Sequence, residues 1–131
     1  MNLTLSTSKA KEIIDITEKI ESALLDTKVK DGICNIYVAH TTCALTTMDL
    51  DPGTDEDMLT ALEKMFPKGN YKHPHNPGHV GEHIWASLIG QFVTIPYANK
   101  KLVLGTWQRI TLIELSGPRD RNLVISIFPS K

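Results

Sequence analysis

Four of the five histidines in this 131-residue chain lie in the segment from His73 to His83. Imidazole titrates close to neutral pH and is the commonest neutral metal ligand in proteins. Two prolines and two glycines interrupt the same segment, so its first part is expected to form a loop. The fifth histidine, His40, ends an apolar run and opens the sequence His-Thr-Thr-Cys. A fold that gathers these side chains would create a metal site or an acid–base site.

The histidine-rich segment allows two interpretations. Its imidazoles are metal ligands or an acid–base pair, or they are solvated loop side chains. The spacing matches no standard motif such as His-Glu-x-x-His, but the density of histidines favours a functional role. Pro77 and Gly78 indicate that a helix is only beginning at His79. His83 therefore lies on more rigid structure, which a catalytic group requires.

The residues that follow His40 could also take part in a site. Thr41 and Thr42 offer hydroxyls and backbone amides to a phosphate, or they simply form a turn. Cys43 is a candidate nucleophile beside His40. A small buried residue is the favoured interpretation, because nothing in the sequence lowers the pKa of its thiol.

Further polar candidates stand at the ends of predicted strands. Asp49 is the acidic residue assigned to a site, because the acidic residues at 51–57 suit the first turn of a helix. Gln108 and Glu114 flank an apolar strand at even spacing, so both are expected on one side of it. That side is either part of a site or exposed to solvent.

Three arginines complete the candidate set. Arg109 is expected to point away from Gln108, whereas Arg119 and Arg121 follow a Gly-Pro pair in a loop. Guanidinium groups there hold a phosphate bidentately or are merely solvated. Trp107 is expected in the core or an interface.

Composition sets the class of the protein. Hydrophobic residues make up 41% of the chain and charged residues 22%, and the formal net charge is −1. These values indicate one globular domain over residues 1–131 and give no sign of binding to nucleic acid or a membrane surface. No apolar run is long enough to span a bilayer, and the first residues lack a signal-peptide pattern. A cytoplasmic protein with two reduced cysteines is therefore expected.

Hydrophobic periodicity predicts how these residues are positioned. Apolar spacing predicts a helix over 16–25, a second that starts at Asp51-Pro52, and a short third helix that ends at Gly90. Strands are expected around Leu3 and Leu5 and over 33–39, 44–49, 92–96, 102–104, 109–114 and 122–128, while residues 12–15 could extend the first helix or form a strand. The fold class is α+β, and its apolar strands leave faces that oligomerisation would cover.

Several motifs together resemble the YjbQ-like family. They are His-Thr-Thr-Cys-Ala-Leu from His40, Tyr-Lys-His ending at His73, His83 with the following Ala-Ser-Leu-Ile-Gly, Leu-Val-Leu-Gly-Thr-Trp-Gln-Arg-Ile from Leu102, and Gly-Pro-Arg ending at Arg119. The resemblance spans nearly the whole chain. It implies a mixed or antiparallel two-sheet sandwich with two main helices and one short helix, assembled as a trimer. It also implies a pocket of histidines and acids that takes a metal or an anion.

The resemblance carries over residue by residue. His40, His73 and His83 match the recurrent histidines of the family, while Gln108, Glu114 and Arg119 match its C-terminal polar positions. This chain departs from the family pattern in three places, with Met48-Asp49 where Asn-Glu is usual, His79 where an asparagine is frequent, and His75, which is not general to the family.

These observations lead to a predicted function. The family resemblance implies a weak, secondary thiamine-phosphate synthase activity, in which a thiazole phosphate displaces pyrophosphate from a pyrimidine. His40, His73 and His83 would hold a divalent metal, with zinc the first candidate and no organic cofactor evident. The catalytic residues are predicted to be His83, Asp49, Glu114 and Gln108. The residues predicted to bind a phosphorylated small molecule are Thr41, Thr42, Arg109 and Arg119.

Two alternatives stay open. The first is a metal-dependent hydrolase of phosphate esters, which needs similar ligands and an activated water. The second is a trimeric protein without enzymatic activity that binds a metabolite or a metal.

Overall fold

The computed structural model describes residues 1–66, 72 and 80–131. Its elements follow the chain in the order β1 (Asn2–Ser6), β2 (Glu12–Asp15), α1 (Thr17–Asp26), β3 (Gly32–Val38), β4 (Cys43–Met48), α2 (Thr54–Met65), α3 (Val80–Ile89), β5 (Phe92–Ala98), β6 (Lys101–Leu102), β7 (Arg109–Glu114) and β8 (Asp120–Pro129). The open question about residues 12–15 is answered in favour of a strand.

Two antiparallel sheets form the framework. One has five strands in the order β1-β8-β3-β5-β6, and the other has three in the order β2-β7-β4. The predicted α+β fold with two sheets and three helices is confirmed, in its antiparallel rather than mixed form. The third helix is not short relative to the first, because α1 and α3 each have 10 residues.

The main core joins the five-stranded sheet to α1 and to the three-stranded sheet, which contributes Leu45 and Leu112. Ile16, Ile20 and Leu24 recur every four residues, so they share one face of the helix, and all three are fully buried. They belong to one cluster with the inward side chains of β3, among them Cys34 and Ile36. Strict alternation along β3 sends one set of side chains into this core and the other outward.

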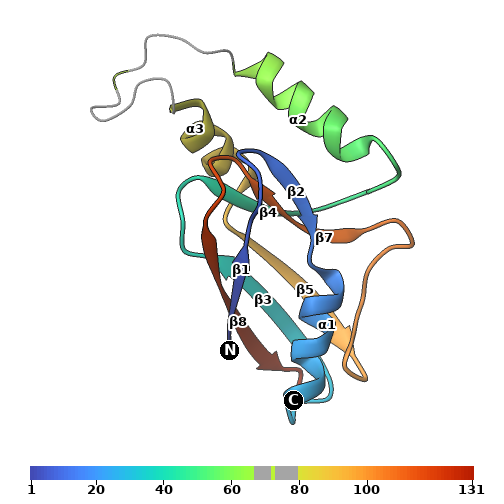
Figure 1. Ribbon diagram of the computed structural model, residues 1–131. Helices are drawn as coiled ribbons and strands as arrows, with labels where there is room; N and C mark the ends of the chain where they lie inside the picture. Colours follow the sequence, from blue (N-terminus) through green and yellow to red (C-terminus); the bar gives the residue numbers. More distant parts are fainter. Residues whose placement is uncertain (67–71, 73–79) are drawn as a thin grey trace.

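A second, smaller core joins α2 and α3 to the three-stranded sheet. Leu62 of α2 and Trp85 of α3 pack with Ile113 and Leu115 at the end of β7. Figure 1 shows both helices at the same end of the molecule, with α1 on the sheet below them. This end also carries the loops that follow β3 and β7.

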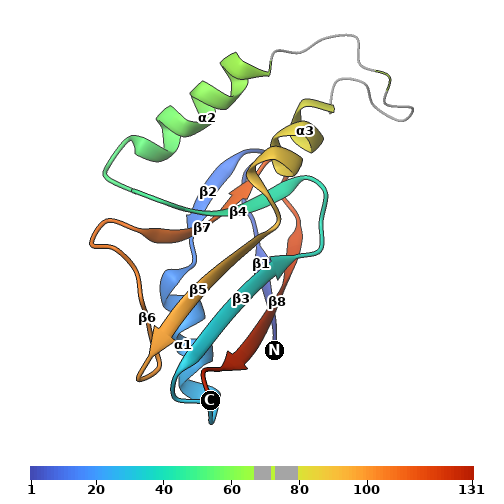
Figure 2. The same ribbon diagram turned by 180° about the vertical axis from the view of Figure 1, so that it is seen from behind.

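The other face of the five-stranded sheet is exposed and apolar. Tyr37 of β3 pairs in register with Phe92 of β5 and Val124 of β8, and Ile33 pairs with Phe128. These five residues are all exposed and define what we call the outer sheet face. Figure 2 shows that none of the helices among the described residues covers β3, β5 and β8 on this side.

The described helices are too short to cross a bilayer. They contain 10 or 12 residues each, and none of them has the length and apolar character of a membrane-spanning segment.

Close packing of two strands requires glycine at residue 32. A Cβ at Gly32 would lie 2.3 Å from the carbonyl oxygen of Phe128 on β8, whereas a Cβ at Gly81 in α3 would find its nearest neighbour at 3.8 Å. Gly32→Ala is therefore expected to lower the free energy of unfolding by about 1–3 kcal/mol. Gly81→Ala should not lower it, because alanine favours a helix by about 0.5–1 kcal/mol over glycine. Urea denaturation of both variants measures the difference, and equal stabilities would contradict it.

Candidate functional site

A cavity of about 420 Å³ opens beside the loops at the helical end of the molecule. Its wall comes from the β3–β4 loop, α3 and the connection from β7 into β8. The lining residues are Ala39, His40, Thr41, Thr42, His83, Ser116, Arg119 and Arg121. We call this cavity the basic pocket. Its volume lies within the range of about 300–1,000 Å³ that is typical of small-molecule sites.

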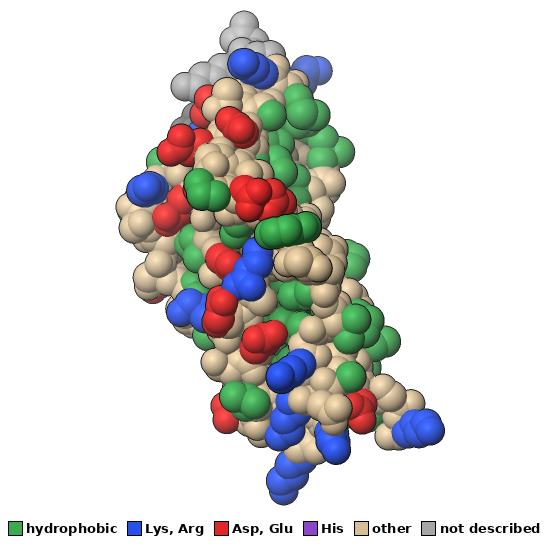
Figure 3. Space-filling view, turned by 90° about the vertical axis from the view of Figure 1, so that its right-hand side faces the viewer, with side chains coloured by type: hydrophobic (Ala, Val, Ile, Leu, Met, Phe, Trp, Pro, Cys, Tyr) green, Lys and Arg blue, Asp and Glu red, His purple; other side chains and the backbone are tan. Residues whose placement is uncertain are grey.

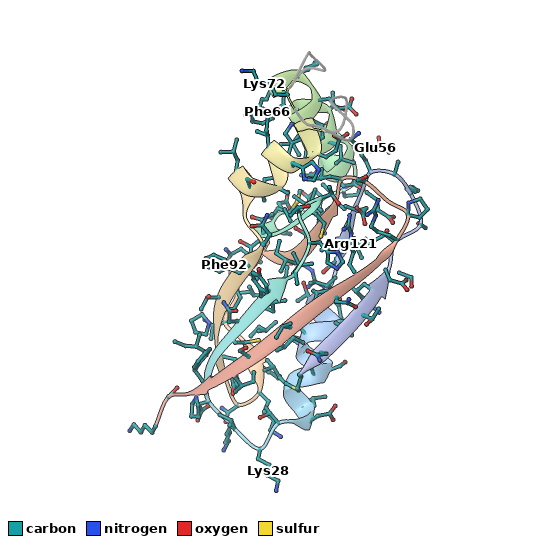
Figure 4. The ribbon with its side chains drawn as sticks, turned by 90° about the vertical axis from the view of Figure 1, so that its left-hand side faces the viewer. Lys28, Glu56, Phe66, Lys72, Phe92 and Arg121 are labelled. Atoms are coloured by element: carbon teal, nitrogen blue, oxygen red, sulfur yellow. The ribbon has the colours of Figure 1, made fainter. Side chains whose placement is uncertain are left out.

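Beneath the pocket lies a fully buried ion pair. Arg121 on β8 donates from Nε to Oε2 of Glu114 at 2.8 Å, and its Nη2 also contacts Oε1 of the same carboxylate. The same Nη2 donates to the carbonyl and hydroxyl oxygens of Thr42, each at 3.0 Å. Both charged side chains have an exposed fraction of 0%. Figure 4 shows Arg121 inside the molecule, near the start of β8.

The carboxylate of Glu114 also organises the pocket's other wall. It accepts hydrogen bonds from the Thr7 hydroxyl at 2.8 Å and from the Ser116 amide at 3.0 Å. The Thr7 oxygen in turn accepts the amide N–H of Arg119 at 3.0 Å. The backbone that carries Arg119 is therefore tied to the buried pair through Thr7.

These contacts determine the charge state of Glu114. Burial alone raises the pKa of a carboxyl group, because it disfavours the charged form. Here the hydrogen bonds from Arg121, Ser116 and Thr7 outweigh burial and lower the pKa of Glu114 below its ordinary value. Glu114 is therefore ionised at neutral pH and balances the charge of Arg121.

Gly117 lets the β7–β8 connection pack tightly. A Cβ at this position would lie 2.3 Å from the carbonyl oxygen of Lys9 and 2.9 Å from Cγ of Glu114. Only glycine fits without displacing the backbone. The following Gly117-Pro118 peptide bond is cis.

His40 is fixed to the strand that carries Arg121. Its Nε2 accepts the backbone N–H of Asn122 at 3.0 Å. Burial lowers the pKa of His40, and the charges of Arg121 and Arg119 lower it further, against a smaller opposing effect of Glu114. Since the ordinary pKa of histidine is already near 6.5, the ring is uncharged at neutral pH.

The structure brings together about half of the residues that the sequence suggested. His40, Thr41, Thr42, His83 and Arg119 all line the basic pocket. Glu114 lies beneath it as the partner of Arg121, which is a structural position rather than one that faces a ligand. His73, His75 and His79 lie outside the described residues.

Arg109 and Asp49 belong to a different cavity. Arg109 donates to Asp15 at 2.7 Å and also pairs with Glu18, so its charge is already offset by two carboxylates. This cavity has a volume of about 260 Å³, and Asp49, Asp51 and Trp107 contribute to its wall together with Asp15 and Arg109. The predicted grouping of Arg109 and Asp49 with the histidines is therefore corrected. Figure 3 shows acidic and basic side chains intermixed on the side of the molecule that carries α1.

Gln108 and Trp107 also differ from expectation. The side-chain oxygen of Gln108 accepts the Gly105 amide at 2.8 Å, and its nitrogen contacts the Thr47 hydroxyl at 3.4 Å. Gln108 thus holds the turn before β7 instead of facing the basic pocket. Trp107 is 69% exposed, so it lies outside the core, and the alternative position in an interface stays a prediction.

Sequence reasoning missed the central role of Arg121. It was noted only as one of two loop arginines, yet it begins the inward-facing series of β8 with Leu123 and Ile125, all of them buried. Alternation along the strand was the signal that could have placed it inside. Cys43 is buried, and burial raises the pKa of its thiol to about 11, which supports the structural role favoured for it.

Comparison with known proteins agrees with this fold. Residues 1–130 match the family described as UPF0047 protein YjbQ-like. The chain belongs to this family. A UPF0047 protein from Archaeoglobus fulgidus is 41% identical over 126 residues, which cover 95% of this chain and 98% of the relative. The UPF0047 protein YugU from Bacillus subtilis is 34% identical over 127 residues, with 96% of both chains covered.

Solved structures of family members share the architecture. A protein from Clostridium acetobutylicum, described as an uncharacterized conserved protein of the family, superimposes with a TM-score of 0.90 at 39% identity over 98% of this chain and 99% of its own. A protein of unknown function from Sulfolobus solfataricus gives a TM-score of 0.92 at 33% identity over 99% of this chain and 96% of its own.

The predicted function is wrong on these findings. The matched family and its solved members are described as uncharacterized or of unknown function, and none of the proteins compared above is described as a thiamine-phosphate synthase. Within residues 1–66, 72 and 80–131, no three His, Cys, Asp or Glu side chains are grouped so that they could hold a metal ion. The described residues therefore give no support to a metal-dependent activity, and His73, His75 and His79 of the histidine-rich segment lie outside them.

The buried pair generates a prediction about stability. Glu114→Gln should lower the free energy of unfolding at pH 7 by about 3–5 kcal/mol, because it leaves Arg121 buried without a counter-charge. The matched control is Glu18→Gln, which removes one of the two carboxylates paired with Arg109. Because the Glu18 side chain is 74% exposed, this change should lower the free energy of unfolding by at most about 1 kcal/mol. Urea denaturation measures both changes.

The same carboxylate contributes to the pH dependence of stability. The pKa of Glu114 is lower in the folded state than its ordinary value of 4.5. Its contribution to the free energy of unfolding is therefore fully present above pH 4.5 and is lost as the pH falls through the pKa of the folded state. Glu114→Gln should therefore flatten the acid limb of the stability curve, and an unchanged acid limb would contradict this assignment.

Proposed function

We propose that this chain binds a small phosphorylated metabolite in the basic pocket. The observation that carries the proposal is the charge of the lining. Two arginines and two histidines line the pocket, and no carboxylate is among the described residues that line it. Arg121 is buried and His40 is uncharged, so the available positive charge is that of Arg119. Glu114 balances Arg121 from beneath, which leaves the charge of Arg119 available to attract an anion.

Arg119 is the principal anion-binding group in this proposal. Two hydrogen bonds with Thr7 hold the backbone of Arg119. The Thr7 N–H donates to the Arg119 carbonyl at 3.0 Å, and the Thr7 hydroxyl oxygen accepts the Arg119 N–H. No ion pair joins its guanidinium to a carboxylate within the described part of the chain. A guanidinium fork on a fixed backbone suits bidentate contact with phosphate oxygens.

The cavity beside Arg109 has a mostly acidic wall, in contrast to the basic pocket. Three aspartates and a single arginine contribute to its wall, so the charge there is unfavourable to a phosphate. Two cavities in one small domain therefore differ in the sign of their charge. This contrast supports the assignment of the anion to the basic pocket.

Thr41 and Thr42 suit the same ligand. Thr42 fixes the loop, because its carbonyl and hydroxyl oxygens accept hydrogen bonds from Arg121. The neighbouring Thr41 is exposed at the pocket wall and offers a hydroxyl to a ligand. The loop after β3 is thereby held to the same buried arginine as the rest of the pocket.

We also propose that copies of this chain associate through the outer sheet face. Tyr37, Phe92 and Val124 lie side by side on adjacent strands there, and a polar row at Asn35 separates them from Ile33 and Phe128. Exposed apolar patches are typical of interfaces. The family resemblance makes a homotrimer the assembly to test.

The phosphate proposal is tested by Arg119→Ala. Removal of a charge-assisted hydrogen bond is worth about 1.5–3 kcal/mol, so affinity for inorganic phosphate should fall by about 10- to 100-fold. Arg109→Ala is the matched control and should leave affinity unchanged, because its guanidinium already pairs with Asp15 and Glu18. Isothermal titration calorimetry measures both, and equal losses from the two variants would sink the proposal.

The association proposal is tested by Phe92→Asp. Phe92 is 61% exposed on the outer sheet face, and Figure 4 shows its side chain at the margin of the molecule. A buried charge at an apolar interface is costly, so sedimentation should show a smaller assembly than for the unaltered chain. Leu25→Asp, on α1 and 65% exposed, is the matched control and should leave the assembly intact. A monomeric unaltered chain would refute the interface.

A further inference from the structure

We infer that His40 contributes to the basic pocket as an uncharged hydrogen-bond donor through Nδ1, and that the backbone of β8 enforces this form. The inference rests on the proposed function and narrows it. It predicts that the ligand places an acceptor oxygen, such as one of a phosphate or carboxylate, against Nδ1 of His40. It also removes His40 from the role of metal ligand.

The hydrogen bond at Nε2 determines the tautomer. The amide N–H of Asn122 donates to this nitrogen at 3.0 Å, so Nε2 must hold a lone pair. A neutral imidazole carries a single proton, and that proton must then lie on Nδ1. His40 thus offers a donor at Nδ1, while the lone pair of Nε2 is already engaged by the protein.

The donor at Asn122 is itself rigid. Asn122 lies on β8 between two fully buried residues, Arg121 and Leu123, and it pairs in register with Thr4 of β1. Arg121 is further fixed by the carboxylate of Glu114. Because the strand cannot turn this N–H away without breaking those contacts, it holds His40 in one tautomer.

The opposite edge of the ring remains available to a ligand. His40 lines the basic pocket, and no acceptor for its Nδ1–H occurs among the residues that the structure describes. A metal ion would need a lone pair at a nitrogen that is protonated or already bonded. An anion needs only the N–H, which matches the charge of Arg119 on the other wall.

Two variants separate the two ring nitrogens. His40→Asn places an amide nitrogen near the position of Nδ1, so it preserves the donor and loses the acceptor for Asn122. His40→Gln places an amide oxygen near the position of Nε2, so it preserves that acceptor and loses the donor.

With inorganic phosphate as the probe, His40→Gln should weaken binding by about 10-fold or more, as loss of a hydrogen bond to a charged group does. His40→Asn should retain affinity closer to that of the unaltered chain. Loss of affinity in the Asn variant alone, or equal affinities in both, would overturn the inference.

The tautomer is measured without any ligand. In protein labelled with ¹⁵N, the ring of His40 should show a protonated Nδ1 and an unprotonated Nε2 at neutral pH. A protonated Nε2 would overturn the inference even if phosphate binds. If the ring is protonated at Nδ1 but neither the unaltered chain nor the variants bind phosphate, the proposed function fails together with the donor role, while the tautomer stands.

Discussion

The buried pair of Arg121 and Glu114 is the interaction on which the pocket depends. Removing two charges from water costs several kcal/mol per ion, and only close geometry with further hydrogen bonds offsets that cost. Here Thr7, Thr42 and Ser116 supply these bonds from three separate parts of the chain. The pair therefore joins the loops into one wall, and displacement of any of these loops would take a hydrogen bond away from a buried charge.

The three arginines of the chain illustrate how context decides the role of one side chain. Arg121 is fully buried and structural, and Arg109 is neutralised near the surface by two carboxylates. Arg119 differs because Thr7 binds its backbone, while no ion pair holds its guanidinium among the residues that the structure describes. A fixed backbone with an available charge is what recognition of an anion requires. The same residue type thus provides a buried structural charge and a surface ion pair, and in our proposal it also binds the anion.

Periodicity in the sequence was sufficient for most of the fold, because amphipathic spacing such as that of Ile16, Ile20 and Leu24 is a local property. The site was harder to predict, since the partner of each charged side chain depends on which strands pair. Nothing near Arg109 in the sequence identifies Asp15, which lies far away along the chain, as its partner. Family resemblance correctly identified the architecture, but it could not carry an activity, because chemistry depends on a few side chains and a fold does not specify them.

Formation of the pocket is also coupled to the pairing of β1 with β8. Thr7 follows the first strand, whereas Arg121 lies on the last, and β1 pairs directly with β8. Contacts so distant in sequence form late, after most of the loop-closure entropy has been lost. A chain still emerging from the ribosome cannot assemble this wall before β8 is made. The wall of the basic pocket therefore forms only when β1 and β8 are both in place.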